Sequence, residues 1–138
     1  SFSANANFSN ANLTLVEMDY GDFFKAKFLD ANLKNASLEN ANLSDSNFSG
    51  ANLNYANLKG TFLGNANLTN CTLIHTNMIG ADLKDADMTS ADLSHADLSS
   101  SLLYNTDFTN AVLKNANFKD SDLTGQNIED LKSRGAII

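Results

Sequence analysis

Residues 81–100 have the sequence ADLKDADMTSADLSHADLSS, which consists of four successive copies of one five-residue unit. Each copy begins with Ala, continues with Asp and has Leu or Met in third place, whereas its last two residues vary. A short unit repeated this regularly is typical of a protein in which every copy forms the same local structure and packs on its neighbours. The repeat therefore decides the fold.

The same unit, here called a quintet, continues in one register from Ala6 to Ile128. All 25 residues at every fifth place from Phe8 to Ile128 are Leu, Phe, Met or Ile, and we call this the central position. Two residues earlier is the small position, which is Ala in fifteen quintets and Gly, Ser, Thr, Cys or Val in nine; Gln126 is large and polar. The residue between them is mostly Asn or Asp and is called the Asx position.

A five-residue period fits neither regular secondary structure. Steps of five residues wander around an α-helix, and in a flat strand they point alternately to opposite faces. Every central residue faces inward if the chain turns the same way once per quintet and winds into a coil around an apolar axis. Successive coils then stack about 4.8 Å apart through parallel backbone hydrogen bonds. The small position follows, because only one of the two inward side chains of a quintet has room to be large.

Across residues 6–128 the consensus Ala-(Asn/Asp)-Leu-x-x resembles the pentapeptide repeat proteins. The resemblance implies an all-β fold, a right-handed quadrilateral parallel β-helix with four quintets per coil. Residues twenty apart are then stacked neighbours, and the quintets make slightly more than six coils, a rod roughly 30 Å long. We predict a single domain over residues 1–138, whose core includes the central residues Phe48, Leu53, Leu58, Leu63, Leu73 and Leu93.

The repeat fails after Ile128, and residues 127–138 are predicted to form a short helical cap on the last coil. Asn127 is the expected N-cap and Gly135 the expected C-cap. Acidic residues in the first turn and basic ones in the last suit the helix dipole; these are Glu129, Asp130, Lys132 and Arg134. The apolar residues expected to cover the last coil are Ile128, Leu131, Ile137 and Ile138.

The two ends of the rod bear on its assembly. Ser1 and Phe2 provide no comparable cap, so either an earlier segment or a docking partner is expected at that end. The chain is predicted to be a monomer or an end-to-end dimer formed through the C-terminal cap.

The composition narrows the classes of function and of partner. The chain has 16 acidic and 9 basic residues, a net charge of -7, which disfavours direct nucleic-acid binding. Hydrophobic residues make up 43% without a membrane span, and the lone Cys71 forms no internal disulfide. A soluble protein is expected from this composition, and no signal peptide pattern is present at the N-terminus. The cytoplasm remains open as its compartment, and so do the periplasm and the thylakoid lumen if a leader was removed, because the family is abundant in cyanobacteria both in the cytosol and exported.

No motif for catalysis or for a cofactor appears, and the protein is predicted not to be an enzyme. The two histidines, His75 and His95, are twenty residues apart and share a column with Tyr55. Such a pair, with Asp92 on the same side, is a candidate for a weak surface metal site. Stacked rings that face solvent are the favoured interpretation, because a third well-aimed ligand is missing.

Aspartate fills the Asx position of four consecutive quintets, at Asp82, Asp87, Asp92 and Asp97, and Asp107 stacks next to Asp87. The favoured interpretation is structural, because Asn and Asp both accept hydrogen bonds from turn backbone. The alternative comes from the resemblance, since some pentapeptide repeat proteins imitate nucleic-acid charge and bind type II topoisomerases such as gyrase. Interspersed lysines and the lack of a loop within the repeats count against it here.

Two large apolar residues, Phe62 and Leu102, occupy Asx positions in one column, with Asp82 between them. Exposed apolar residues that cluster mark a protein-binding patch. The predicted function is therefore a non-enzymatic β-helical scaffold that binds an unidentified protein, without a cofactor. The candidate interaction surface comprises Phe62, Leu102 and the five aspartates named above.

Overall fold

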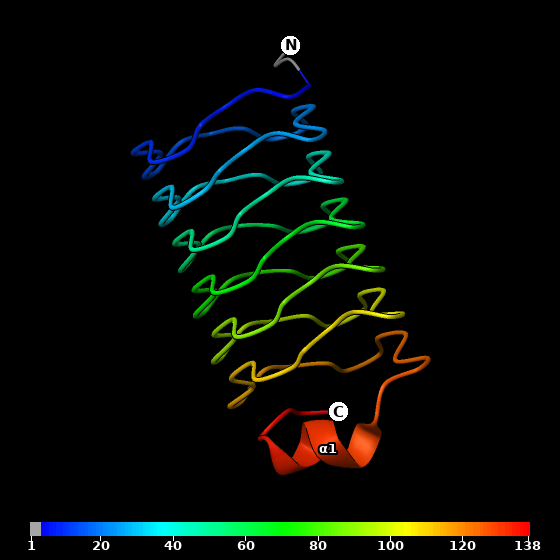
Figure 1. Ribbon diagram of the computed structural model, residues 1–138. Coiled ribbons are helices and arrows are strands. Elements are labelled where there is room, and N and C mark those ends of the chain that lie inside the picture. Colours follow the sequence, from blue (N-terminus) through cyan, green and yellow to red (C-terminus); the bar gives the residue numbers. More distant parts are fainter. Residues whose placement is uncertain (1–3) are drawn as a thin grey trace.

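The computed structural model describes residues 4–138, so the expectation about Ser1 and Phe2 lies outside the described part. From Asn5 to Gln126 the chain winds into the predicted right-handed, four-sided coil (Figure 1). Parallel backbone bridges join residues twenty apart, from Asn7 with Lys27 to Leu102 with Asp122. This spacing shows that four quintets make one coil.

Each side of the coil is too short to form a strand, and the described residues contain only isolated bridges, one per quintet. Around Leu53, for example, its N–H donates to the carbonyl of Thr72 at 2.8 Å, and the N–H of Thr72 donates back to Ala51 at 3.1 Å. The N–H of Ala56 closes the turn by donating to the carbonyl of Leu53 at 3.0 Å. Backbone hydrogen bonds are thus made partly between coils and partly within each corner.

The corners have one repeated backbone conformation. The last residue of every quintet from Asn5 to Gly125, here called the corner position, has φ between 54° and 83°. Such a φ is the mark of the second central residue of a type II turn, and Gly, Asn, Asp and His tolerate it best. These four types fill most corner positions, and no β-branched residue occupies one. The preference is visible in the sequence, but we did not predict the left-handed corner from it.

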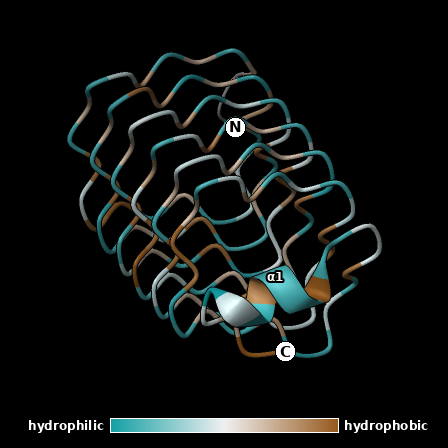
Figure 2. Cartoon of the chain, turned by 60° about the horizontal axis from the view of Figure 1, so that its bottom comes forward, coloured by the Kyte–Doolittle hydropathy of each residue, from teal (hydrophilic) through white to brown (hydrophobic). Residues whose placement is uncertain are grey.

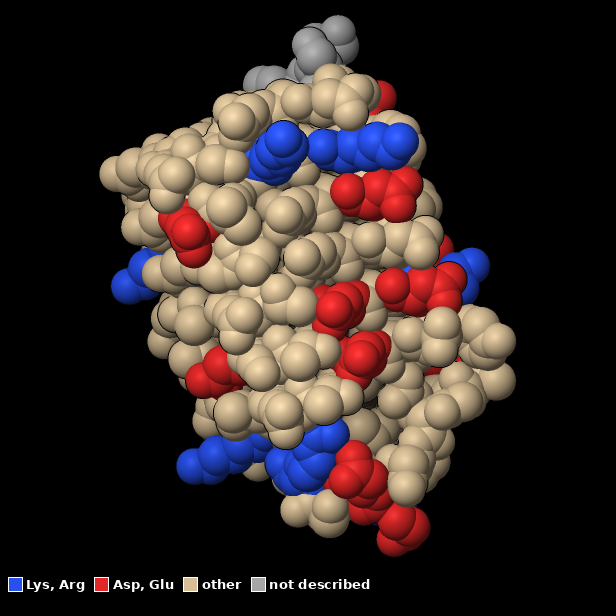
Figure 3. Space-filling model, viewed as in Figure 1, with Lys and Arg blue, Asp and Glu red and all other residues tan. Residues whose placement is uncertain are grey.

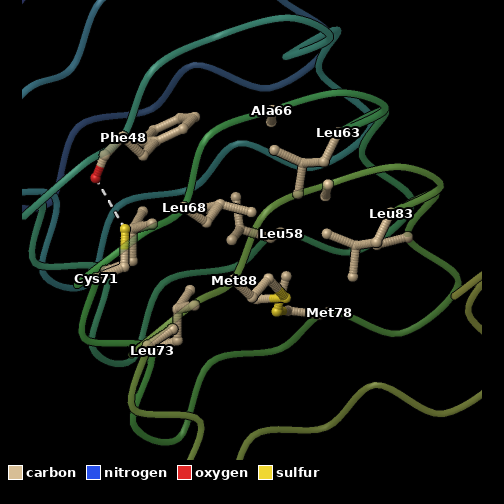
Figure 4. Close-up of a cluster of buried hydrophobic side chains, with 14 of the residues drawn as sticks. Phe48, Leu58, Leu63, Ala66, Leu68, Cys71, Leu73, Met78, Leu83 and Met88 are labelled. Atoms are coloured by element: carbon tan, nitrogen blue, oxygen red, sulfur yellow. Dashed lines mark hydrogen bonds between the residues drawn. The ribbon is translucent and has the colours of Figure 1, made fainter. Parts of the chain in front are cut away.

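The interior is filled by the central and small residues (Figure 4). The six central residues named above as core are each at most 1% exposed. The rings of Phe28 and Phe48 lie parallel, with 4.5 Å between centroids, which matches the spacing of neighbouring coils. Hydrophilic and hydrophobic residues alternate along the sides, as the inward and outward positions require (Figure 2).

Polar residues at small positions are buried with their hydrogen bonds satisfied. Thr61 donates to the carbonyl of Leu58 at 2.8 Å, and Thr76 donates to that of Leu53 at 2.9 Å. The Cys71 thiol lies 2.8 Å from the carbonyl oxygen of Phe48 (Figure 4). Burial raises the pKa of this thiol to about 12, because the thiolate would lose its hydration. Cys71 is therefore a core residue, not a nucleophile.

The C-terminal helix, α1 (Ile128–Ser133), begins as predicted, with the Asn127 side chain accepting a hydrogen bond from the N–H of Asp130. The expected C-cap was wrong by one residue, because Arg134 is the C-cap and Gly135 follows it with φ of 93°. Arg134 also donates to the carbonyls of Phe108 and Ala111. In the middle of the rod the next coil would supply a backbone donor to the Ala111 carbonyl. At the end of the stack the Arg134 side chain supplies it instead.

Gln126 explains the exception at the small position. Its side-chain amide donates to the carbonyls of Leu103 and Thr106, both at 2.9 Å. Thr106 would otherwise receive the backbone N–H of a further coil, which α1 replaces. A large polar residue is thus needed at this one small position because the coil ends there.

After α1 the chain returns to the quintet register. Ile137 forms a parallel bridge with Asn117, again twenty residues apart, and Ala136 returns to the small position with 9% exposure. The prediction that Ile137 and Ile138 cover the last coil was wrong, since they are 42% and 38% exposed. Leu131 covers it instead, with 2% exposure, because α1 directs this residue inward while the tail resumes the coil.

Candidate functional site

The outer surface is organised by one recurring hydrogen bond. In seventeen quintets the side-chain oxygen at the Asx position accepts the backbone N–H two residues later, at 2.9–3.2 Å. Asn52, for instance, accepts from Asn54 at 3.0 Å. We call this the Asx cap. It satisfies a backbone donor that neither the neighbouring coils nor the turn can reach.

The five aspartates of the predicted interaction surface all make the Asx cap, as the asparagines do. Their partners are Lys84, Thr89, Ser94, Ser99 and Thr109, at 2.9–3.1 Å. The bridge register puts Asp82, Asp87, Asp92 and Asp97 on four different faces of the rod, so they encircle it. Acidic and basic side chains are dispersed in the same way over the face seen in Figure 3. The structure thus does not gather these aspartates into one patch.

Hydrogen bonds from Thr109 hold the pKa of Asp107 below its ordinary value, through the Thr109 hydroxyl first and its N–H second. Thr124 lowers the pKa of Asp122 in the same way. Both contacts favour the charged carboxylate. The local structure at the Asx position thus accommodates a charged aspartate.

Seven quintets lack Asn or Asp at the Asx position, and in two of them a side chain of the preceding coil supplies the acceptor instead. Where Thr72 occupies the Asx position, the side chain of Asn54 accepts the N–H of Ile74 at 2.9 Å. Asp19 does the same for the N–H of Glu39 at 2.9 Å. A missing cap is therefore compensated at these two positions.

No such compensation exists at Phe62 and Leu102. Their side chains accept no hydrogen bond, and within residues 4–138 the N–H groups of Gly64 and Tyr104 have no partner. The same is true of the N–H groups of Asp19, Leu29 and Lys114. We call one side of the rod the Leu63 face; its quintets are centred on Phe23, Leu43, Leu63, Leu83, Leu103 and Leu123. Of the five uncapped N–H groups, two lie on this face, and each of the two follows a large apolar residue at the Asx position. No other face has two.

The Leu63 face thus carries exposed apolar side chains on both sides of a charged pair. Phe62 is 53% exposed, Leu102 39% and Tyr104 50%, and bridges join Phe62 to Asp82 and Asp82 to Leu102. The Lys84 amino group lies 3.8 Å from the carboxylate of Asp82 between them. We call Phe62, Gly64, Leu102 and Tyr104, with Asp82 and Lys84 at their centre, the Phe62 patch.

Gly64 leaves the backbone bare beside Phe62. Its φ lies outside the left-handed region, and an added Cβ would meet only the carbonyl of Lys84, at an ordinary 3.7 Å. The fold therefore does not require glycine here. Gly60, on the other side of Phe62, does occupy a left-handed corner. Another molecule can therefore approach the backbone closely at Gly64, whereas the Asn40 side chain already occupies the space over Gly60.

Tyr55, His75 and His95 form the predicted column. The rings of Tyr55 and His75 are 5.2 Å apart, and those of His75 and His95 are 4.8 Å apart, tilted by 15° and 10°. Imidazole binds a metal in the plane of its ring, so nearly parallel rings do not direct their nitrogens at one point. Asp92 caps Ser94, and residues 4–138 contain no group of three His, Cys, Asp or Glu that could hold a metal ion.

An open depression of about 500 Å³ lies where the last coil meets α1. Its walls include Asp107, Thr109, Asp130 and Arg134. Arg134 is already bonded to two carbonyls and, at 3.0 Å, to Asp130. The depression is therefore part of the joint between coil and cap, and its charged groups are engaged within it.

The sequence matches the pentapeptide repeats family in eight copies, over residues 26–65, 66–103 and 91–127. The chain therefore belongs to the pentapeptide repeat family. No curated protein gives a significant sequence match. Within the described residues no helix is long and apolar enough to cross a membrane.

Solved structures of the family resemble this one. The pentapeptide repeat protein Rfr23 from the cyanobacterium Cyanothece 51142 is 30% identical over 69% of this chain, with a TM-score of 0.62. This chain spans 62% of the length of that protein. A trypsin-treated variant of QnrB1, a plasmid-mediated fluoroquinolone resistance protein, is 21% identical over 91% of this chain and 74% of its own, with a TM-score of 0.63. At that identity the likeness concerns the fold.

Proposed function

We propose that this protein is a non-catalytic scaffold that binds another protein through the Phe62 patch. The observation that carries the proposal is the pair of broken Asx caps at Phe62 and Leu102. At both positions an exposed apolar side chain replaces a residue that would stabilise the turn, and both lie on one face. Places where a repeat departs from its own local rule without compensation are characteristic of functional sites.

The remaining surface supports a binding role over a catalytic one. The one cysteine is buried and protonated, and both histidines are in an exposed ring stack. On the sides of the rod, most side chains at the Asx position are engaged in Asx caps. Repeat solenoids typically act by presenting such extended surfaces to macromolecules.

Site-specific photo-crosslinking in cells tests this proposal. A photoreactive phenylalanine replaces Tyr104 in the Phe62 patch, and in a matched control it replaces Ser99 on the neighbouring Leu58 face. We expect a discrete crosslinked protein from position 104 that excess wild-type protein competes away and Phe62→Asn protein does not. No crosslink at 104, or equal crosslinks at both positions, contradicts the proposal.

The second candidate function is inhibition of a type II topoisomerase by charge imitation. It is supported by the excess of 16 acidic over 9 basic residues and by the likeness in fold to QnrB1. The encirclement of the rod by its aspartates weighs against it, because DNA presents its charge along continuous backbones. A supercoiling assay with purified gyrase tests it, and unchanged supercoiling at micromolar protein rejects it.

A further inference from the structure

The Phe62 patch also indicates what kind of protein segment would bind it; this inference rests on the proposed function. Three observations define the ligand: the apolar side chains of Phe62 and Leu102, the uncapped N–H of Gly64 and the charge around them. We propose that the patch binds a polypeptide segment that carries apolar and basic side chains and whose backbone carbonyl accepts the Gly64 N–H.

The first part of the binding site is its hydrogen-bond donor, the N–H of Gly64. In other quintets, the Asx side chain lies on the outer surface and caps the N–H that corresponds to that of Gly64. This N–H is therefore accessible from outside when no Asx side chain is present. Phe62 accepts no hydrogen bond, and Gly64 has no side chain to hinder approach. An incoming carbonyl can therefore occupy the place that Asn52 or Asp92 oxygen occupies in its own quintet.

The apolar contact is the second part. Phe62 is 53% exposed beside Gly64, so its ring can enter between side chains of a partner while the partner's backbone reaches the chain at Gly64. Leu102 and Tyr104, two coils further along, provide a second apolar contact beyond Asp82 and Lys84. Aromatic side chains in such surroundings are the usual anchors of protein interfaces.

The charge is the third part. The Leu63 face with its two flanking corners carries six carboxylates and two lysines: Asp22, Asp45, Asp82, Asp85, Asp120, Asp122, Lys25 and Lys84. Lys84 is already 3.8 Å from Asp82, and the Asp85 carboxylate accepts a hydrogen bond from Asn105 at 2.7 Å. The surplus negative charge favours basic side chains on the partner and repels acidic ones. It also favours a neutral carbonyl over a carboxylate as the acceptor for Gly64.

The proposal is tested by ¹⁵N NMR titration of the full chain with three capped peptides. These are Lys-Leu-Lys-Leu-Lys-Ser-Lys, its counterpart with Glu in place of every Lys, and its counterpart with Ser in place of every Leu. We expect only the first to shift the Gly64 and Tyr104 amide signals, the Gly64 N–H moving downfield as it gains an acceptor. Equal shifts with the Ser peptide, shifts with the Glu peptide, or an unmoved Gly64 signal overturn the proposal.

Phe62→Asn is the decisive variant, because it removes the ring and restores the Asx cap over Gly64 without endangering the fold. We expect it to weaken binding of the Lys-Leu peptide about tenfold or more, since both an apolar anchor and a hydrogen bond are lost. Val112→Asn is the matched control, as it makes the same kind of change on the Leu53 face, beside the uncapped N–H of Lys114. Wild-type affinity for Val112→Asn supports the proposal, and wild-type affinity for Phe62→Asn overturns it.

The scaffold function and the ligand chemistry of the patch can be contradicted separately. If position 104 crosslinks a partner in cells but the Lys-Leu peptide leaves Gly64 unmoved, the scaffold function stands and the ligand chemistry assigned here is wrong. If the crosslink is also absent, the proposed function is wrong.

Discussion

The coil formed by residues 81–100 and the stretch around Phe62, residues 59–64, share one backbone and differ in their surfaces. In the first, all four Asx positions are aspartates that cap the turn, at 3.0–3.1 Å. In the second, Phe62 leaves the cap unmade and lies between two glycines. The inward residues are equally buried in both, Leu63 and Leu83 being 0% exposed.

The difference teaches that fold and surface are specified by separate positions of the quintet. The central and small residues hold the coil through apolar burial, worth roughly 1.5–3 kcal/mol for each large side chain. The Asx residue contributes a single surface hydrogen bond of about 1 kcal/mol. A residue that serves binding can therefore replace the Asx residue with little loss of stability, whereas replacing a central residue would destabilise the coil.

The largest expected effect comes from breaking the inward part that both regions share. Leu53→Asp places an unpaired carboxylate in the core, and we expect it to lower the free energy of unfolding by more than about 4 kcal/mol, with loss of several coils. Asn54→Asp is the matched control one residue away, because its carboxylate still accepts the N–H of Ile74. Urea denaturation measures both, and equal midpoints would contradict the assignment of inward and outward positions.

Removing a cap from the regular coil should have an intermediate effect. Asp92 accepts both the N–H and the hydroxyl of Ser94, at 3.0 and 2.6 Å. We expect Asp92→Ala to cost about 1 kcal/mol of stability and Asp92→Asn to cost nearly nothing. If Asp92→Asn were as destabilising as Asp92→Ala, the carboxylate would have a role beyond the cap.

Adding a cap where one is missing should have the opposite sign. Phe62→Asn installs the acceptor for the Gly64 N–H and removes an exposed ring, so we expect a gain of about 0.5–1 kcal/mol in urea denaturation. Phe62→Leu, which supplies no acceptor, should show no such gain. A loss of stability in Phe62→Asn would mean that Phe62 supports the fold instead of a partner.

The smallest effect concerns pH. The Thr109 contacts lower the pKa of Asp107 in the folded chain, so this carboxylate stabilises the fold above its unfolded pKa of about 3.9. That stabilisation is lost as the pH falls from there through the folded pKa. Thermal melting at pH 6 and pH 3 should therefore show a slightly smaller decrease for Asp107→Asn than for wild type. A larger decrease in the variant would reverse the sign of this coupling.

The sequence predicted the repetitive parts well because each prediction could be checked in many quintets. The twenty-residue register and the buried central column are both present. Predictions that concerned a single place succeeded less often. Ile137 and Ile138 were expected to be covering residues, but the tail rejoins the coil in register and leaves them exposed.

The candidate site was only partly visible in the sequence. Phe62 and Leu102 could be assigned to one column, since their separation of forty residues is two coils. The free N–H of Gly64 could not be recognised, because its significance depends on which donors the neighbouring coils satisfy. At Ile74 the preceding coil supplies an acceptor through Asn54, and at Gly64 it supplies none.

By itself the sequence determined the period and the inward residues, because apolar burial depends on residue type and spacing. The period left the number of quintets per coil open; the family resemblance implied four, and the twenty-residue bridges show four. Only the tertiary structure decided which surface donors are left free, how Gln126 and Arg134 end the stack and that the aspartates encircle the rod. These features depend on groups from different coils meeting within hydrogen-bond distance, and that distance is set by the stacking of coils, not by the order of residues in one quintet.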